Sequence, residues 1–171
     1  MRPNLWQRID MFVRHQVPLV LTLMLLLISV VPSHAAGLTR IGPMLALIAV
    51  YYWAIYRPDL LGIGAVFLIG VAQDLLTGTP PGVAALALLL TQAVVLSQYR
   101  FFNARSFAVT WWAFSLVAAG AMTVQWLAVS LVYGTLVDAS AAFYGYLMTV
   151  AIYPVVGWLL ARVQIAFLRD V

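Results

Sequence analysis

Long apolar segments alternate with single charged residues along this chain, a pattern that predicts transmembrane helices. Between Arg14 and Arg40 lie 25 residues without Asp, Glu, Lys or Arg, more than the roughly 20 apolar residues that span a bilayer. Similar segments follow through the rest of the sequence. The pattern predicts further spans within residues 41–56, 60–76, 82–98, 106–137 and 141–161.

The second of these segments is short. The 16 residues from Ile41 to Tyr56 give a helix of roughly 24 Å at 1.5 Å per residue. We therefore expect Arg40 and Arg57 to extend toward the head groups, or the bilayer to become thinner there. Two prolines bear on other spans. Pro18 is expected in the first turn of the first helix, where a missing N–H does no harm, and Pro154 is expected to kink the last.

Composition supports a membrane protein. The chain is 65% hydrophobic and 8% charged, with a mean hydropathy of +1.03, whereas soluble domains are about half apolar and a quarter charged. No polar linker divides it. We predict an all-α integral membrane protein, a bundle of six transmembrane helices, forming a single domain over residues 1–171. Residues 1–14 are expected to form a short cytoplasmic segment that lies along the membrane surface.

The arginines predict the orientation. The chain has nine Arg and no Lys, and six spans would leave only Arg40 on one side. Since positive residues concentrate in cytoplasmic loops, both termini are expected in the cytoplasm of a bacterial cell, with the protein in its inner membrane. The other eight arginines are then cytoplasmic: Arg2, Arg8, Arg14, Arg57, Arg100, Arg105, Arg162 and Arg169. Because they are spread over loops, they do not indicate nucleic-acid binding.

Little in the sequence supports catalysis. Cysteine and glutamate are absent and the only histidines are His15 and His34, so we expect no disulfide, no metal and no cofactor. The serines lack a histidine at helix depth. An aspartyl protease needs two carboxylates sharing one site, and only Asp74 qualifies. No phosphate-binding glycine pattern is present. We predict that the protein is not an enzyme.

Asp74 is the most informative polar residue, because a carboxylate at membrane depth is costly and usually has a partner. Two interpretations are open. Asp74 either lies at the outer interface and caps the turn through N–H groups near Leu76 or Thr77, or pairs with a cation or donor of another helix or a partner protein. Arg40, expected at the same face, would allow an Asp74–Arg40 pair.

Small residues surround Asp74. Gly78 and Gly82, with two prolines between them, predict a tight turn outside the cytoplasm, with glycine supplying positive φ; a re-entrant bend is the alternative. Gly62, Gly64 and Gly70 are expected to let helices pack closely within the bundle, or else to form a groove for a partner. Aromatic residues near predicted span ends are expected to anchor the protein at the interface; these are Tyr51, Tyr52, Trp53, Tyr56, Trp111 and Trp112.

The order of these residues resembles the MreD family of bacterial rod shape-determining proteins. Its most diagnostic pattern is a glycine, an aspartate followed by apolar residues, a Gly-x-x-x-Gly turn and an Ala-Leu pair. The matching residues here are Gly70, Asp74, Leu75, Leu76, Gly78, Gly82, Ala85 and Leu86. The segment from Pro43 to Trp53, and the later Phe143, Tyr144, Pro154 and Arg162, are also similar. Pro81 departs from the pattern, since the family often has an apolar residue there.

The resemblance implies a non-enzymatic scaffold of the machinery that extends the lateral peptidoglycan wall. Its implied partners are an MreC-like bitopic protein, a RodA-like polymerase, a penicillin-binding transpeptidase, the filament protein MreB and membrane lipid. Asp74, Gly70, Gly78, Gly82 and Arg40 would form the partner-binding or structural motif. A compact six-helix protein also resembles the substrate-binding subunits of vitamin transporters, which would need a polar pocket opening outward.

Overall fold

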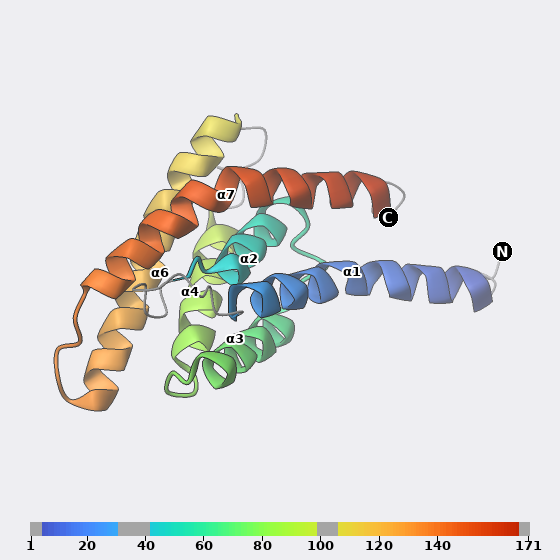
Figure 1. Cartoon of the computed structure of the whole chain (residues 1–171). Coiled ribbons are helices and arrows are strands. Elements are labelled where there is room, and N and C mark those ends of the chain that lie inside the picture. The colour runs from blue at the N-terminus through green and yellow to red at the C-terminus, as the bar shows by residue number, and fades with distance from the viewer. Residues whose placement is uncertain (1–4, 31–41, 99–105, 168–171) are drawn as a thin grey trace.

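The computed structural model of the protein describes residues 5–30, 42–98 and 106–167, and within these ranges all regular structure is α-helical (Figure 1). Six helices fall on the six predicted segments, which confirms the all-α class. They are α1 (Leu5–Val30), α2 (Leu45–Tyr56), α3 (Ile63–Thr77), α4 (Val83–Ser97), α6 (Phe107–Tyr133) and α7 (Ser140–Phe167).

The helices differ greatly in length. Helices α6 and α7 have 27 and 28 residues, and in the described part of the chain these two are long and apolar enough to cross a membrane. Helix α2 has 12 residues, and α3 and α4 have 15 each, which gives about 18 to 23 Å at 1.5 Å per residue. The described residues therefore form six helices, but length alone does not make each one a complete span.

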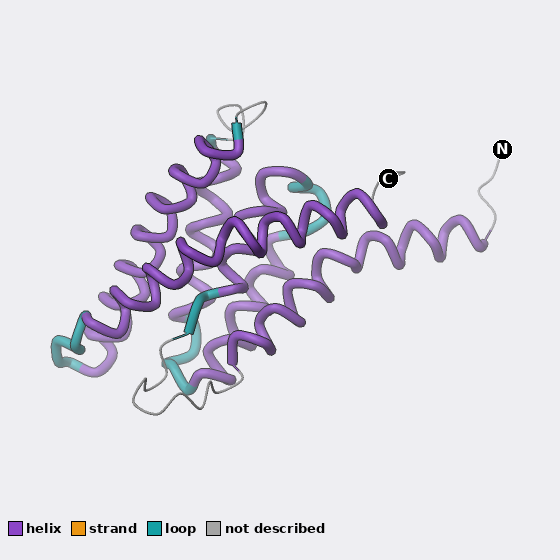
Figure 2. Tube along the Cα trace, turned by 45° about the horizontal axis from the view of Figure 1, so that its top comes forward, coloured by secondary structure: helices purple, strands orange, loops and turns teal. Residues whose placement is uncertain are grey.

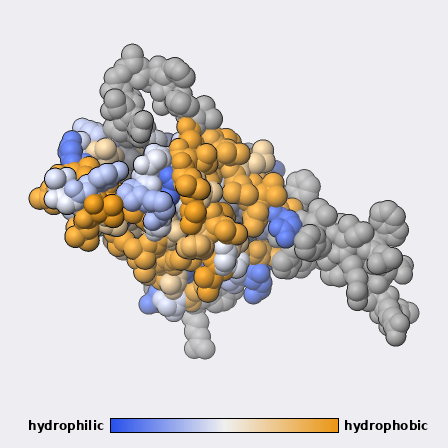
Figure 3. Space-filling view, turned by 90° about the horizontal axis from the view of Figure 1, so that it is seen from below, coloured by the Kyte–Doolittle hydropathy of each residue, from blue (hydrophilic) through white to orange (hydrophobic). Residues whose placement is uncertain are grey.

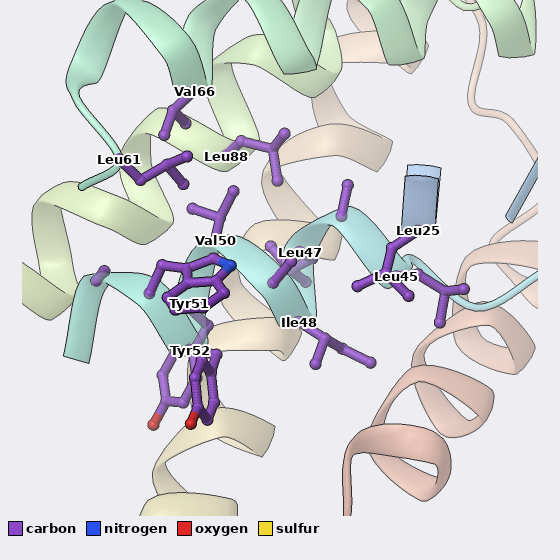
Figure 4. Close-up of a cluster of buried hydrophobic side chains, with 14 of the residues drawn as sticks. Leu25, Leu45, Leu47, Ile48, Val50, Tyr51, Tyr52, Leu61, Val66 and Leu88 are labelled. Atoms are coloured by element: carbon purple, nitrogen blue, oxygen red, sulfur yellow. The ribbon is translucent and has the colours of Figure 1, made fainter. Parts of the chain in front are cut away.

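Helix α2 forms the centre of the bundle. Every residue from Leu45 to Ile55 is buried, and the helix packs against α1, α4 and α7. Figure 4 shows its side chains meeting Leu25 of α1, Val66 of α3 and Leu88 of α4. A helix that is apolar on all sides is a buried one. Neighbouring helices thus enclose α2, while the expected extension of Arg40 and Arg57, or a thinner bilayer there, stays a prediction.

The aromatic residues of α2 correct one expectation. Tyr51 and Trp53 are 0% exposed and Tyr52 is 5% exposed, so they belong to the core and are not interfacial anchors. The rings of Phe114 and Tyr153 stack at 4.3 Å, and Tyr51 lies edge-on to Phe114 at 5.0 Å. The Tyr51 hydroxyl donates a hydrogen bond to the Thr110 carbonyl over 2.9 Å. This cluster joins α2, α6 and α7.

The helix ends fall on two opposite sides of the bundle. The first turn of α1 and the last turn of α7 extend on the same side, where α2 also connects to α3 (Figures 1 and 2). The turn between α3 and α4 and the loop between α6 and α7 lie on the other side. The two described connections on the far side thus lie opposite the ends of α1 and α7; the six-span topology stays a prediction.

Pro154 lies where the sequence predicts a kink, whereas Pro18 does not lie where it was expected. Helix α1 begins at Leu5, so Pro18 lies inside the helix and not in its first turn, contrary to expectation. The Thr22 hydroxyl donates to the Pro18 carbonyl over 2.6 Å. Residues 5–14 are continuous with the first apolar segment. Pro154 lies inside α7, and Figure 1 shows α7 changing direction near its middle, as a proline kink predicts.

The outer surface is strongly apolar. Leu116, Leu131 and Trp112 are 71–81% exposed, and apolar residues cover most of the face seen in Figure 3, with hydrophilic residues at the left and in smaller patches at the right and lower edges. Soluble monomers rarely expose apolar patches of this extent. The surface is that of a protein whose helices contact lipid.

The entry to α2 depends on a hydrogen bond from α7. The Met44 N–H, just before α2, donates to the Thr149 hydroxyl over 3.0 Å, and this hydroxyl donates to the Gly145 carbonyl over 2.6 Å. Thr149 is completely buried. Non-helical backbone at membrane depth needs such a partner inside the protein.

We predict that Thr149→Val lowers the free energy of unfolding by about 0.6–1.7 kcal/mol, from the average to the maximum found for hydrogen bonds between membrane helices. Reversible unfolding in mixed micelles measures it. Thr123→Val is the matched control, because the Thr123 hydroxyl bonds only to Ala119 within exposed α6. Equal losses in both variants would contradict a special role for Thr149.

Candidate functional site

The carboxylate of Asp74 lies in the last turn of α3, 0% exposed, and accepts three hydrogen bonds from the segment that follows. Its Oδ1 accepts from the Thr79 hydroxyl over 2.7 Å and from the Ala84 N–H over 2.9 Å. Its Oδ2 accepts from the Gly82 N–H over 2.8 Å. The side chain therefore joins the end of α3 to the start of α4.

These hydrogen bonds satisfy backbone N–H groups at the start of α4. The first N–H groups of any helix lack partners within the helix, and the residue before α4 is Gly82, which has no side chain to cap it. The carboxylate of Asp74 provides the cap from the preceding helix. Its negative charge also lies at the positive end of the α4 dipole, where anions are stabilised.

The backbone of Asp74 closes α3 in the same turn. Its carbonyl accepts the N–H of Gly78 and, over 3.1 Å, that of Thr79. Gly78 and Gly82 have φ of +71° and +100°, a left-handed region that strongly favours glycine. The predicted tight turn and its positive-φ glycines are present in the structure; its location outside the cytoplasm stays a prediction. One aspartate thus ends one helix with its backbone and begins the next with its side chain.

Gly70 holds the same two helices together one turn earlier. A Cβ on Gly70 would lie 2.3 Å from the Cα and 2.9 Å from the Cβ of Ala85 in α4. Only glycine fits such a close approach. Gly70 and Asp74 are four residues apart and share one face of α3. We call the unit that Gly70, Asp74, Gly78 and Gly82 form at the junction of α3 and α4 the α3–α4 clamp.

The expectations for these residues are partly corrected. Asp74 caps a turn, but the donors are the N–H groups of Gly82 and Ala84, not those near Leu76 or Thr77. Arg40 lies outside the described residues, so its proposed pairing with Asp74 stays a prediction.

The glycines of α3 also divide into two kinds. Gly70 packs inside the bundle as expected, whereas Gly62 and Gly64 are exposed and a Cβ on either would meet nothing within 4 Å. For these two, packing within the bundle is the wrong explanation.

The sequence did not single out Thr79 or Ala84. Thr79 looks like any polar turn residue, and Ala84 contributes only its backbone N–H, which every residue except proline has. A useful signal would have been the lack of a capping side chain at Gly82, because an uncapped buried helix start needs an accepting group from elsewhere.

A second aspartate caps a helix at the surface. Asp138, before α7, accepts the N–H of Ser140 over 3.0 Å and its hydroxyl over 2.6 Å. These hydrogen bonds lower the pKa of the Asp138 carboxyl. It is an exposed loop residue. Among the described side chains no three His, Cys, Asp or Glu lie close enough to hold a metal ion.

Comparison with known families identifies the chain. Residues 10–163 match the model of the family described as rod shape-determining protein MreD. The chain belongs to the MreD family. The match includes the whole α3–α4 clamp and most of every described helix. No significant match is found among curated proteins or among solved structures.

Membership confirms the resemblance and part of what it implied. MreD is a membrane family with a role in rod shape determination, and it is not known as a family of enzymes. The apolar surface and all-helical bundle agree with a membrane protein of this family.

We predict that Asp74→Ala lowers the free energy of unfolding by about 1–3 kcal/mol, because it leaves buried N–H groups of Gly82 and Ala84 without partners. Asp74→Asn should lower the free energy of unfolding by less, since its remaining oxygen can still accept hydrogen bonds from Thr79 and Ala84. Reversible unfolding in mixed micelles measures both.

Asp138→Ala is the matched control, because it removes a cap from a helix start that water can reach. A loss in Asp74→Ala no larger than in Asp138→Ala would contradict the importance of the buried cap.

Proposed function

We propose that this MreD-family protein is a non-enzymatic scaffold of the cell-elongation machinery in the bacterial inner membrane. The observation that carries the proposal is the family match across residues 10–163, which links the whole helical bundle to rod shape determination. In this role the protein holds other membrane proteins of lateral peptidoglycan synthesis in position. Its partners are an MreC-like bitopic protein, a RodA-like polymerase, a penicillin-binding transpeptidase and MreB.

The physical basis of such a scaffold is a rigid helix pair with an exposed apolar face. The α3–α4 clamp fixes α3, whose outer face exposes Gly64 together with Phe67 and Leu68, 47% and 66% exposed. Membrane helices associate through close packing beside small residues. This face supports the docking of a single transmembrane helix, as in an MreC-like partner. The clamp residues then act by positioning the face, not by touching the partner.

The transporter alternative has less support. A vitamin-binding subunit needs convergent polar groups in a ligand-sized pocket. The groove that the structure describes between α2 and α7 is lined mainly by aromatic and small apolar residues, with Gln164 as its one amide. Its chemistry is closer to that of lipid than of a water-soluble vitamin.

The proposed topology has six spans and both ends in the cytoplasm, on the basis of the arginine distribution. Reporter fusions after Arg105 and after Asp138 are expected to report cytoplasm and periplasm, respectively. The α6 helix lies between these two points, so they test one complete crossing. The opposite pattern, or both reporters on one side, would overturn this topology.

We predict that Asp74→Ala and Gly82→Val each reduce co-purification with the MreC-like partner and shorten the cells. The first removes the cap of α4, and the second places a β-branched residue at φ +100°, where it is strained. Cell shape, pull-down yield and expression level are measured together.

Arg169→Gln is the control and should leave all three unchanged. Normal rods and full partner recovery with Asp74→Ala at wild-type expression would show that the clamp does not support the scaffold.

A further inference from the structure

A groove opens between α2 and α7 beside the start of α6. Its volume is about 570 Å³, within the range of small-molecule sites. Pro154, Gly157 and Ala161 recur along α7 at helical spacing and form one side of it, and larger rings enclose it. The rings are those of Tyr52, Tyr56, Phe107, Tyr153 and Trp158.

Gly157 is the most revealing of these residues. It is buried, yet a Cβ placed on it would meet no atom within 4 Å beyond its own helix turn. The space above it is thus part of the groove and is not filled by a neighbouring side chain. In a close-packed interior such space would be costly, so the groove is suited to an occupant from outside the chain.

The length of the groove indicates what the occupant is. Along α7 its lining runs from Tyr153 to Ile165, about 18 Å at 1.5 Å per residue. One leaflet of the hydrocarbon core is about 15 Å thick, half of the total of about 30 Å. A spanning helix would need the whole thickness, whereas a lipid chain needs one leaflet. The groove matches the lipid chain.

Polar groups lie in or beside one end of the groove: Gln164 lines it, and Arg162 lies against Trp158, one of its lining rings. There the Tyr52 hydroxyl donates to Gln164 Oε1 over 2.7 Å. The guanidinium of Arg162 lies 5.0 Å from the centre of the Trp158 ring. Trp158 lines the groove and is 59% exposed. Arginine is a strong donor to phosphate, and cytoplasmic leaflets carry anionic lipids.

We infer that the groove binds an anionic phospholipid of the cytoplasmic leaflet, with one acyl chain over Gly157 and the phosphate at Arg162. The choice of leaflet rests on the proposed topology, but the groove and its polar end do not depend on the scaffold role. The aromatic rings contact the acyl chain, and Arg162 gives the preference for a negatively charged head group.

The test uses the full-length protein reconstituted into vesicles of equal phosphatidylglycerol and phosphatidylcholine, extracted in mild detergent and examined by native mass spectrometry. The wild type is expected to retain phosphatidylglycerol in preference to phosphatidylcholine. Gly157→Leu fills the groove and should reduce bound phosphatidylglycerol about tenfold, equivalent to about 1.4 kcal/mol of binding free energy. Arg162→Gln should keep a bound lipid but lose the preference between the two.

Gly120→Leu is the matched control. Gly120 is also a helical glycine on which an added Cβ would meet nothing within 4 Å, but it lies on the exposed face of α6. The control variant should retain lipid like the wild type. Gly157→Ala, which adds only one methyl group, should give an intermediate loss and serves if the leucine variant does not fold.

Wild-type retention of phosphatidylglycerol by folded Gly157→Leu and Gly157→Ala would overturn the inference. So would unchanged lipid binding together with reduced recovery of the MreC-like partner, because the groove would then hold a protein helix. Failure here is separable from failure of the scaffold proposal, which is measured by cell shape in the Asp74 and Gly82 variants.

Discussion

The buried carboxylate of Asp74, which the start of α4 holds through hydrogen bonds, organises the half of the molecule that contains α3 and α4. Asp74 is completely buried, so its carboxylate must be satisfied by protein donors. The N–H groups of Gly82 and Ala84 provide them, and they can reach Asp74 only if the turn reverses sharply between α3 and α4. The positive φ of Gly78 and Gly82 and the close approach at Gly70 follow from this requirement. The residues of the family pattern therefore form one structural unit, in which the conformation of each depends on the others.

The other half of the molecule depends on aromatic packing around α2. Tyr51, Phe114 and Tyr153 come from three helices that are distant in sequence, and the Thr149 hydroxyl completes the entry to α2. In a membrane, lipid tails are as apolar as leucine, so apolar contact alone does not select one arrangement. Ring geometry and a few buried hydrogen bonds select one arrangement of these helices. The clamp and this cluster meet through α4, which packs against both α2 and α3.

Charge spacing was sufficient to predict the order of the described helices, because each break in the apolar pattern carries an arginine, an aspartate or a Gly–Pro turn. Tertiary relationships were not predictable. A tyrosine in an apolar segment has the same sequence signature in a core as at an interface, so Tyr51 and Tyr52 were assigned wrongly. Pro18 was misplaced because the helix extends through Arg8 and Arg14, which looked like a boundary. For Asp74, the role of a cap was foreseeable from Gly78 and Gly82, but its backbone donors were not, since any residue could supply them.

The enclosure of α2 has a consequence for how the chain is made. A helix of 12 residues is too short to be stable in the bilayer by itself, and the helices that cover it are α1, α4 and α7. Helix α7 follows the other three along the sequence, so it is synthesised after them. The Met44–Thr149 bond joins residues 105 apart and needs α7 in place. The core around α2 is therefore complete only after α7 has packed against it, which makes the docking of α7 the step that fixes α2 in position.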